Sequence, residues 1–257
     1  MKILDLRDPA RAFSPVVPEL PHLRESAIAT WRGRMINEHS SARVFDGLAE
    51  QFAAAGLHDV VSEVRSFAAE ERRHGILCGA VVQALGGEAY AEIPEGEEYP
   101  AHDDAKSPLE AALRNMLSIC CLSETVAVSL IGAERIEMPE GELRDLLTTI
   151  YADEVGHSRF GWRTIARLAP TLDAEMKERL GDYLEVAFDA LVVHELAHLP
   201  MNSNPPAEGV AYGLCSGPDA RVLFLDTINE VIVPGLEAHG IPAKRAWKNA
   251  QQHALAA

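Results

Sequence analysis

The chain has 257 residues, of which 47% are apolar, and a formal net charge of −16. This is the composition of an ordinary globular protein with enough apolar material for a substantial core. Because no cluster of Lys and Arg offsets the negative charge, we expect neither a nucleic acid nor an anionic membrane surface as a partner.

Residues 1–22 contain four prolines and are predicted to form an extended N-terminal arm. Helical spacing of apolar residues then runs over about 23–55 and 59–85, and each run stops at glycine. The polar stretch 87–107 is long for a connection inside a domain. It would suit a crossover between two parallel helices of a bundle.

The third predicted helix has a strong start signal at Ser107-Pro108-Leu109-Glu110, which gives a capping serine, a proline at the first helical position and a glutamate at the third. Strand signals are nearly absent. The sequence therefore predicts an all-α protein in which 23–170 form a four-helix bundle and 171–257 add two or three helices to the same domain. After Ser107 we expect a third helix over about 108–136 and, after a short turn at Pro139 and Gly141, a fourth helix that ends at about 168. The further helices are expected over 171–199, over 217–238 and in a short segment after Pro242.

Each of the four long predicted helices interrupts its apolar stripe with a glutamate, and two of them add a histidine one turn later. Burying an isolated carboxylate costs several kcal/mol even after relaxation. Four carboxylates facing one another would repel unless cations lay between them, and two divalent metals would supply that charge. Iron or manganese suits such mixed oxygen and nitrogen ligands better than zinc. The predicted ligands are Glu38, Glu71, His74, Glu124, Glu154 and His157.

The spacing of these residues carries more weight than the Glu-x-x-His motif, which occurs four times in the chain. Glu38 precedes Glu71 by 33 residues, and Glu124 precedes Glu154 by 30, so each pair spans one predicted hairpin. The two halves therefore match as an internal duplication. The alternative is a set of hydrogen-bonded core residues without a metal.

A glutamate followed by Glu-x-x-His on the next helix, present twice, resembles the ligand pattern of the ferritin-like di-iron carboxylate superfamily. That group includes bacterioferritin, rubrerythrin, the ribonucleotide reductase small subunit and the bacterial di-iron monooxygenases. The resemblance covers about residues 23–169 and selects no single family. It implies a ferritin-like bundle that holds two iron ions, or an Fe/Mn or Mn/Mn pair.

Glu70 and Asp153 each immediately precede a predicted ligand glutamate. In monooxygenase-like relatives an acid at that place orients a ligand histidine, as metal-bound imidazoles generally require. We therefore expect Asp153 to contact His74 and to pair with Arg73. The alternative is that both acids are solvated helix residues.

Two cysteines lie one turn from predicted ligands: Cys78 follows His74, and Cys120 precedes Glu124. They are candidates for lining a pocket, with ordinary helix packing as the alternative. The chain has no Cys-x-x-Cys pair, no apolar run long enough for a signal peptide and no run of about 18 apolar residues. We therefore expect a cytoplasmic protein with reduced thiols and no membrane span.

Several functions compete for such a site. The favoured one is an O2-activating oxygenase or oxidase that acts on a small organic substrate, receives electrons from a reductase and forms a homodimer. An iron-binding ferroxidase or storage protein is the alternative. A rubrerythrin-like peroxide reductase fits less well, because Ala127 stands where that family has a further acidic ligand. A tRNA hydroxylase of this fold is disfavoured by the negative charge.

A rival signal is His194-Glu195-Leu196-Ala197-His198, which spells the zincin motif of two histidines one turn apart with a glutamate base. A zincin also needs a third ligand downstream, and the sequence offers none in a suitable context. A zinc hydrolase is therefore a second alternative, and a structural role on the fifth predicted helix is favoured.

Overall fold

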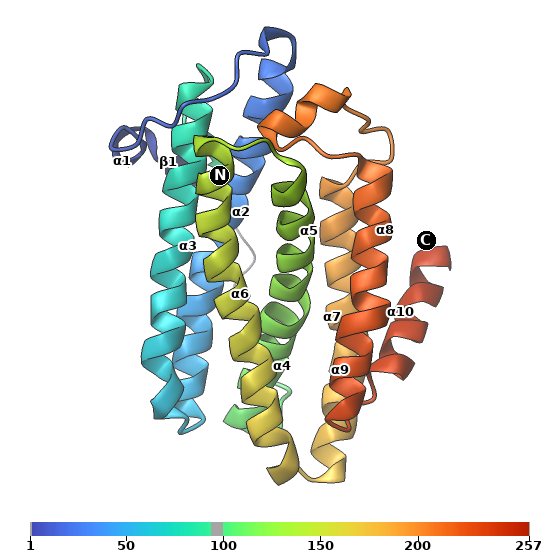
Figure 1. The fold of residues 1–257 in the computed structure, drawn as a ribbon. Helices are drawn as coiled ribbons and strands as arrows, with labels where there is room; N and C mark the ends of the chain where they lie inside the picture. The colour runs from blue at the N-terminus through green and yellow to red at the C-terminus, as the bar shows by residue number, and fades with distance from the viewer. Residues whose placement is uncertain (1, 94–99, 257) are drawn as a thin grey trace. The chain divides into compact units, whose positions relative to one another are not determined.

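The computed structural model describes residues 2–93 and 100–256, with side chains through Gln252. In that part of the chain the protein is helical apart from one two-stranded sheet, which confirms the all-α class (Figure 1). The chain packs as two compact units. The first unit comprises Met1–Ala101, Glu134–Asp153 and Pro205–Cys215, and the second comprises His102–Ala133, Glu154–Asn204 and Ser216–Ala257. The domain boundaries expected from the sequence, at residues 22 and 170, stay a prediction.

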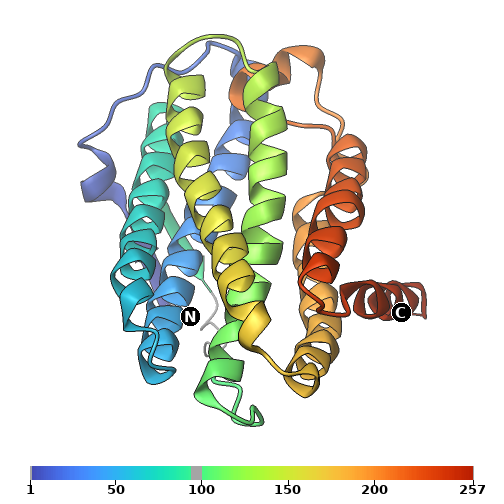
Figure 2. The same cartoon turned by 60° about the horizontal axis from the view of Figure 1, so that its bottom comes forward.

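The first unit is built on a hairpin of two long helices, α2 (Arg24–Ala54) and α3 (His58–Ala84), which lie side by side in Figures 1 and 2. Their apolar stripes face each other, and the Phe45 and Phe67 rings meet edge to face at 5.5 Å. A Cβ on Gly75 would lie 3.4 Å from the Met35 carbonyl oxygen. The two helices therefore approach closely at the level where the predicted ligands stand.

Glycine ends both helices of this hairpin, as the sequence predicts. Gly56 and Gly86 follow the last helical turns with φ of 77° and 86°, a conformation that costs glycine little. After Gly56, the Leu57 amide donates to the Phe52 carbonyl at 2.9 Å. These are Schellman ends, in which backbone amides satisfy the last carbonyls of the helix.

The N-terminal arm is more regular than predicted. Strand β1 (Lys2–Asp5) pairs antiparallel with β2 (Tyr90–Ile93), and the short helix α1 (Arg7–Ala10) and the 3-10 turn η1 (Pro21–Leu23) follow β1. The sequence analysis predicted neither these short elements in the arm nor a strand in the crossover segment. Four-residue strands show little periodicity, and their pairing joins distant parts of the chain. Residues 94–99 of the predicted crossover lie outside the described residues.

Polar contacts hold the segment Pro205–Cys215 and the start of the chain against α2 within the first unit. The Trp31 indole Nε1 donates to the Tyr212 carbonyl at 2.9 Å, and the Tyr212 hydroxyl donates to the Pro18 carbonyl at 2.6 Å. Arg34 forms a largely buried ion pair with Glu134. The 3-10 turn η4 (Ala207–Tyr212) thereby fixes the arm against α2.

The third predicted helix, which lies mainly in the second unit, is continuous but changes its winding. It consists of α4 (Pro108–Met116), the π-helical segment η2 (Leu117–Ser123) and α5 (Glu124–Glu137). The Ser107 side chain accepts from the Glu110 amide at 3.2 Å, so the predicted cap is confirmed. Sequence periodicity did not predict the π segment, which ends directly before Glu124.

This same helix, Pro108–Glu137, is long and apolar enough to span a membrane by length and composition alone. Half of its most apolar window is buried inside the protein. Core helices of proteins that never enter a membrane pass the same test, so this helix is weak evidence for a span.

The remaining helices follow the predicted order. They are α6 (Glu142–Leu168), η3 (Ala169–Thr171), α7 (Ala174–His198), α8 (Gly217–Thr227), the π-helical η5 (Ile228–Ile232), α9 (Val233–Ala238) and α10 (Ala243–Ala256). In the second unit α10 packs on α7, where the Phe188 and Trp247 rings lie 5.3 Å apart and Asn249 donates to Glu185 at 2.9 Å.

Two glycines on α6 give a test of packing against the π segment. A Cβ on Gly161 would lie 2.6 Å from the Cys120 Cβ, whereas Gly156 is exposed with nothing within 4 Å. We expect Gly161→Ala to lower the free energy of unfolding by about 1–3 kcal/mol through overpacking. Gly156→Ala is the matched control and should raise it by up to about 1 kcal/mol through helix propensity. Urea unfolding measures both, and equal effects would contradict the close approach.

Candidate metal centre

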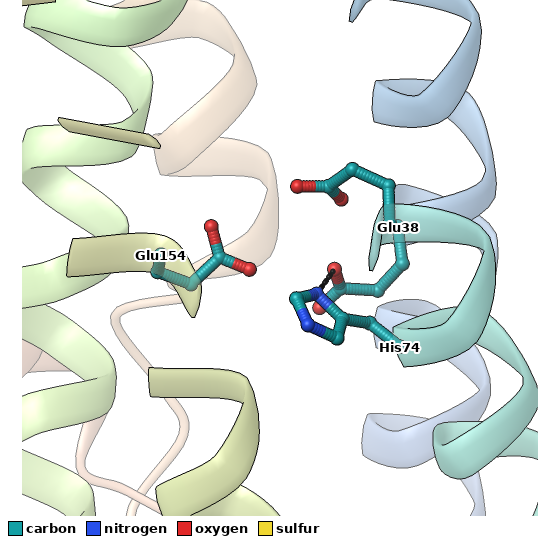
Figure 3. A group of neighbouring side chains, drawn as sticks. Glu38, His74 and Glu154 are labelled. Carbon is teal, nitrogen blue, oxygen red and sulfur yellow. Dashed lines mark ion pairs between the residues drawn. The ribbon is translucent and has the colours of Figure 1, made fainter. Parts of the chain in front are cut away.

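The first unit contains a group of three potential ligands, Glu38 on α2 and Glu71 and His74 on α3. One ligand atom of each lies within 4.8 Å of the others. Glu71 and His74 are 1% and 0% exposed, so the interrupted apolar stripe does face the core. The His74 Nδ1 lies 3.3 Å from Glu38 Oε2, and Figure 3 shows this ion pair as a dashed line. Glu154, also labelled there, lies on α6 in the second unit.

Asp153 holds the other side of the His74 ring. Its Oδ2 lies 3.0 Å from His74 Nε2 and 2.5 Å from Arg73 Nη2, so both contacts expected from the sequence are present. A carboxylate only accepts, and one lies at each nitrogen of this ring, so both nitrogens can donate while the ring is protonated. With Nε2 held by Asp153, Nδ1 is the nitrogen that a cation beside Glu38 would take.

The second unit contains a matching group, Glu124 on α5 and Glu154 and His157 on α6. Their ligand atoms also lie within 4.8 Å of one another. All three are buried, and His157 is 0% exposed. The His157 Nδ1 lies 3.1 Å from Glu154 Oε2 and 3.9 Å from Glu124 Oε2. The two units thus present the same donor set of two carboxylates and one imidazole.

Glu124 shows the electrostatic cost of this arrangement. Burial raises the pKa of Glu124 well above its usual value, and the neighbouring Glu154 carboxylate raises it further, while His157 acts in the opposite direction. Desolvation and a like charge both disfavour the ionised form. The group therefore favours a bound cation, or a proton in its place.

Hydrogen bonds next to these ligands link the helices that carry them. Thr125, the residue after Glu124, lies 2.9 Å from Ser158, the residue after His157, and their hydroxyls share a hydrogen bond. Trp162 Nε1 donates to Thr125 Oγ1 at 3.0 Å. Residue type alone gives no signal for the hydrogen bond between Thr125 and Ser158, because serine and threonine in helices are common. Their positions beside the predicted ligands were the available signal.

The donor chemistry fits a metal ion in each unit. Two carboxylates and one imidazole leave further positions for water or substrate, which suits ions that take five or six mixed oxygen and nitrogen ligands. The presence of buried Glu and His groups that could hold a metal confirms that part of the prediction. The identity of the metal stays a prediction.

The other predicted site residues have varied surroundings. Cys78 and Cys120 are fully buried, and Cys120 packs against Gly161. Neither cysteine lines the two surface hollows of about 460 and 350 Å³ that border the arm. A pocket role for the cysteines, like an orienting role for the half-buried Glu70, stays a prediction.

We expect the metal-free protein to reveal the burial of Glu124 through its pH dependence. The pKa of Glu124 is higher in the folded state than the ordinary 4.5, so the folded state retains a proton that the unfolded state releases. This contribution to stability is complete below about pH 4.5 and is lost as the pH rises through the folded-state pKa.

Glu124→Gln removes this titration. Without metal, the variant should therefore have a larger free energy of unfolding than wild type near pH 7, and its free energy of unfolding should fall less between pH 5 and pH 7. Urea unfolding in the presence of a chelator measures both curves. The exposed Glu140→Gln serves as control and should follow wild type. Parallel curves for wild type and Glu124→Gln would contradict the assignment.

Asp153→Ala should weaken metal binding by about 10- to 100-fold, because His74 loses the acceptor that fixes its tautomer. Asp145→Ala, at an exposed position on the same helix, is the control and should bind like wild type. Titration with Mn²⁺ measures the affinity. Equal affinities of the two variants would show that Asp153 does not orient the ligand.

Comparisons of the chain with protein-family models, with curated proteins and with solved structures find no match.

Proposed function

We propose that the two ligand groups would hold a pair of iron ions, and that the protein is an O2-activating oxidoreductase. Its substrate would be a small organic molecule, and a separate reductase would supply electrons. The pattern of ligands, which resembles that of the ferritin-like di-iron proteins, supports this proposal. We also propose that the protein is a homodimer and that it is cytoplasmic.

The observation that carries the proposal is the same buried donor set in both halves of the chain. Four carboxylates carry four negative charges, which two divalent cations balance. The chain itself links the two groups: Asp153, which contacts His74, is followed directly by Glu154 on α6.

When bound, two iron(II) ions with open positions supply electrons for the reduction of dioxygen. The chain's own residues prepare that chemistry. Asp153 accepts from His74 Nε2 and so leaves Nδ1 as the nitrogen that would hold a cation. Glu124 gives up its proton when a cation arrives. The burial of all three residues in the second group keeps bulk water out.

The helices beyond residue 170 favour an oxygenase or oxidase over simple iron storage. Within the second unit α7 and η5 pack on the π segment that precedes Glu124. A Cβ on Gly235 of α9 would lie 2.7 Å from the Trp162 ring, so α9 also closes on the hydrogen-bonded chain beside the ligands. Elements added around a metal group can enclose a substrate, which storage does not need.

Metal analysis of protein purified without added metal, followed by the optical response of the reduced iron form to oxygen, tests the proposal. We expect about two irons per chain and an absorption change after oxygen is admitted. Glu71→Ala and Glu154→Ala should each lose iron and this response, while the exposed Glu50→Ala should keep both. Oxidation of many irons per chain in a large closed cage would instead indicate a ferroxidase. Fewer than one iron in wild type would end the proposal.

A further inference from the structure

A second set of metal-binding side chains lies on α7, outside both ligand groups. His194 and His198 stand one helical turn apart, and their ring centroids are 4.5 Å from each other. Both side chains are exposed. Two imidazoles at this spacing lie on the same face of a helix, where one cation can contact both.

Hydrogen bonds fix the tautomers of both rings. The His198 Nδ1 lies 2.8 Å from the His194 carbonyl oxygen, and the His194 Nδ1 lies 3.1 Å from Glu195 Oε1. Both partner oxygens only accept, so in each neutral ring the proton is on Nδ1 and the lone pair is on Nε2. Oxygen acceptors at the far nitrogen are the usual support of a metal-bound imidazole.

Glu195 differs from the glutamate of a zinc hydrolase. Its side chain is only 14% exposed and its carboxylate contacts His194. A general base must instead reach the water that the metal binds. Among the described residues, the groups of three or more ligands close enough to hold a metal do not include either histidine.

We propose that His194 and His198 form a two-imidazole site for a late first-row divalent cation such as Zn²⁺, with Glu195 as the residue that positions His194. Imidazole suits zinc, copper and nickel, and waters would complete the coordination. The site is independent of the proposed di-iron centre, because none of its residues belongs to either buried group.

Calorimetric titration of the full-length chain with Zn²⁺ tests the site by counting equivalents. The double variant His194→Ala with His198→Ala should bind one equivalent fewer than wild type. The matched control, His58→Ala with His239→Ala, also removes two histidines, which stand on separate elements, and should bind like wild type. Both histidines of the site are exposed, so the double variant should fold, which far-UV circular dichroism verifies. Equal stoichiometry in wild type and the double variant would overturn the site.

Glu195 variants test the positioning role. Glu195→Ala should weaken Zn²⁺ binding at this site by about 10- to 100-fold. Glu195→Gln should weaken it less, because the amide oxygen still accepts from His194 Nδ1. Wild-type affinity in Glu195→Ala would refute the role. Zinc-dependent hydrolysis of a peptide by wild type that disappears in Glu195→Gln would identify Glu195 as a base and overturn the proposal.

Discussion

The main constraint on this structure is the electrostatic repulsion between carboxylates that are buried beside one another. Glu124 and Glu154 are 5% and 3% exposed, and the pKa of Glu124 is raised because burial and its neighbour both disfavour charge. The folded chain can hold these acids only with protons or cations between them. Metal binding would therefore also contribute to folding, since a preformed site does not exist in the unfolded chain.

The burial of the predicted ligands could be foreseen because helical periodicity and burial are tightly linked. Glu71 and His74 occupy core positions of an apolar stripe, and the structure buries both almost completely. A polar residue at such a position needs a partner, so its chemistry can be read from spacing alone. The glycine helix ends and the Ser107 cap were predictable for a similar reason, because each depends on a few neighbouring residues.

What the sequence did not reveal depends on distant pairing or on a change without a compositional signal. Strands β1 and β2 have four residues each and find each other across about a third of the chain. Leu117–Ser123 has the same apolar character in an α- or a π-helix, so periodicity could not distinguish them. A π-helical turn often occurs at a functional site, and here it ends directly before the predicted ligand Glu124.

The contrast between α7 and the buried groups shows that residue type alone does not decide the role of a glutamate. Glu154 and Glu195 each lie next to a histidine nitrogen at 3.1 Å. Glu154 shares its buried site with a second carboxylate, so a cation lowers the energy of both acids. Glu195 contacts the exposed imidazole of His194, and among the described residues it belongs to no group of three or more potential metal ligands. Its proposed role is therefore to orient that ring. In the proposed sites, the same Glu–His pairing would therefore supply two ligands where two acids are buried together, and one ligand with its hydrogen-bond partner where a single acid lies near the surface.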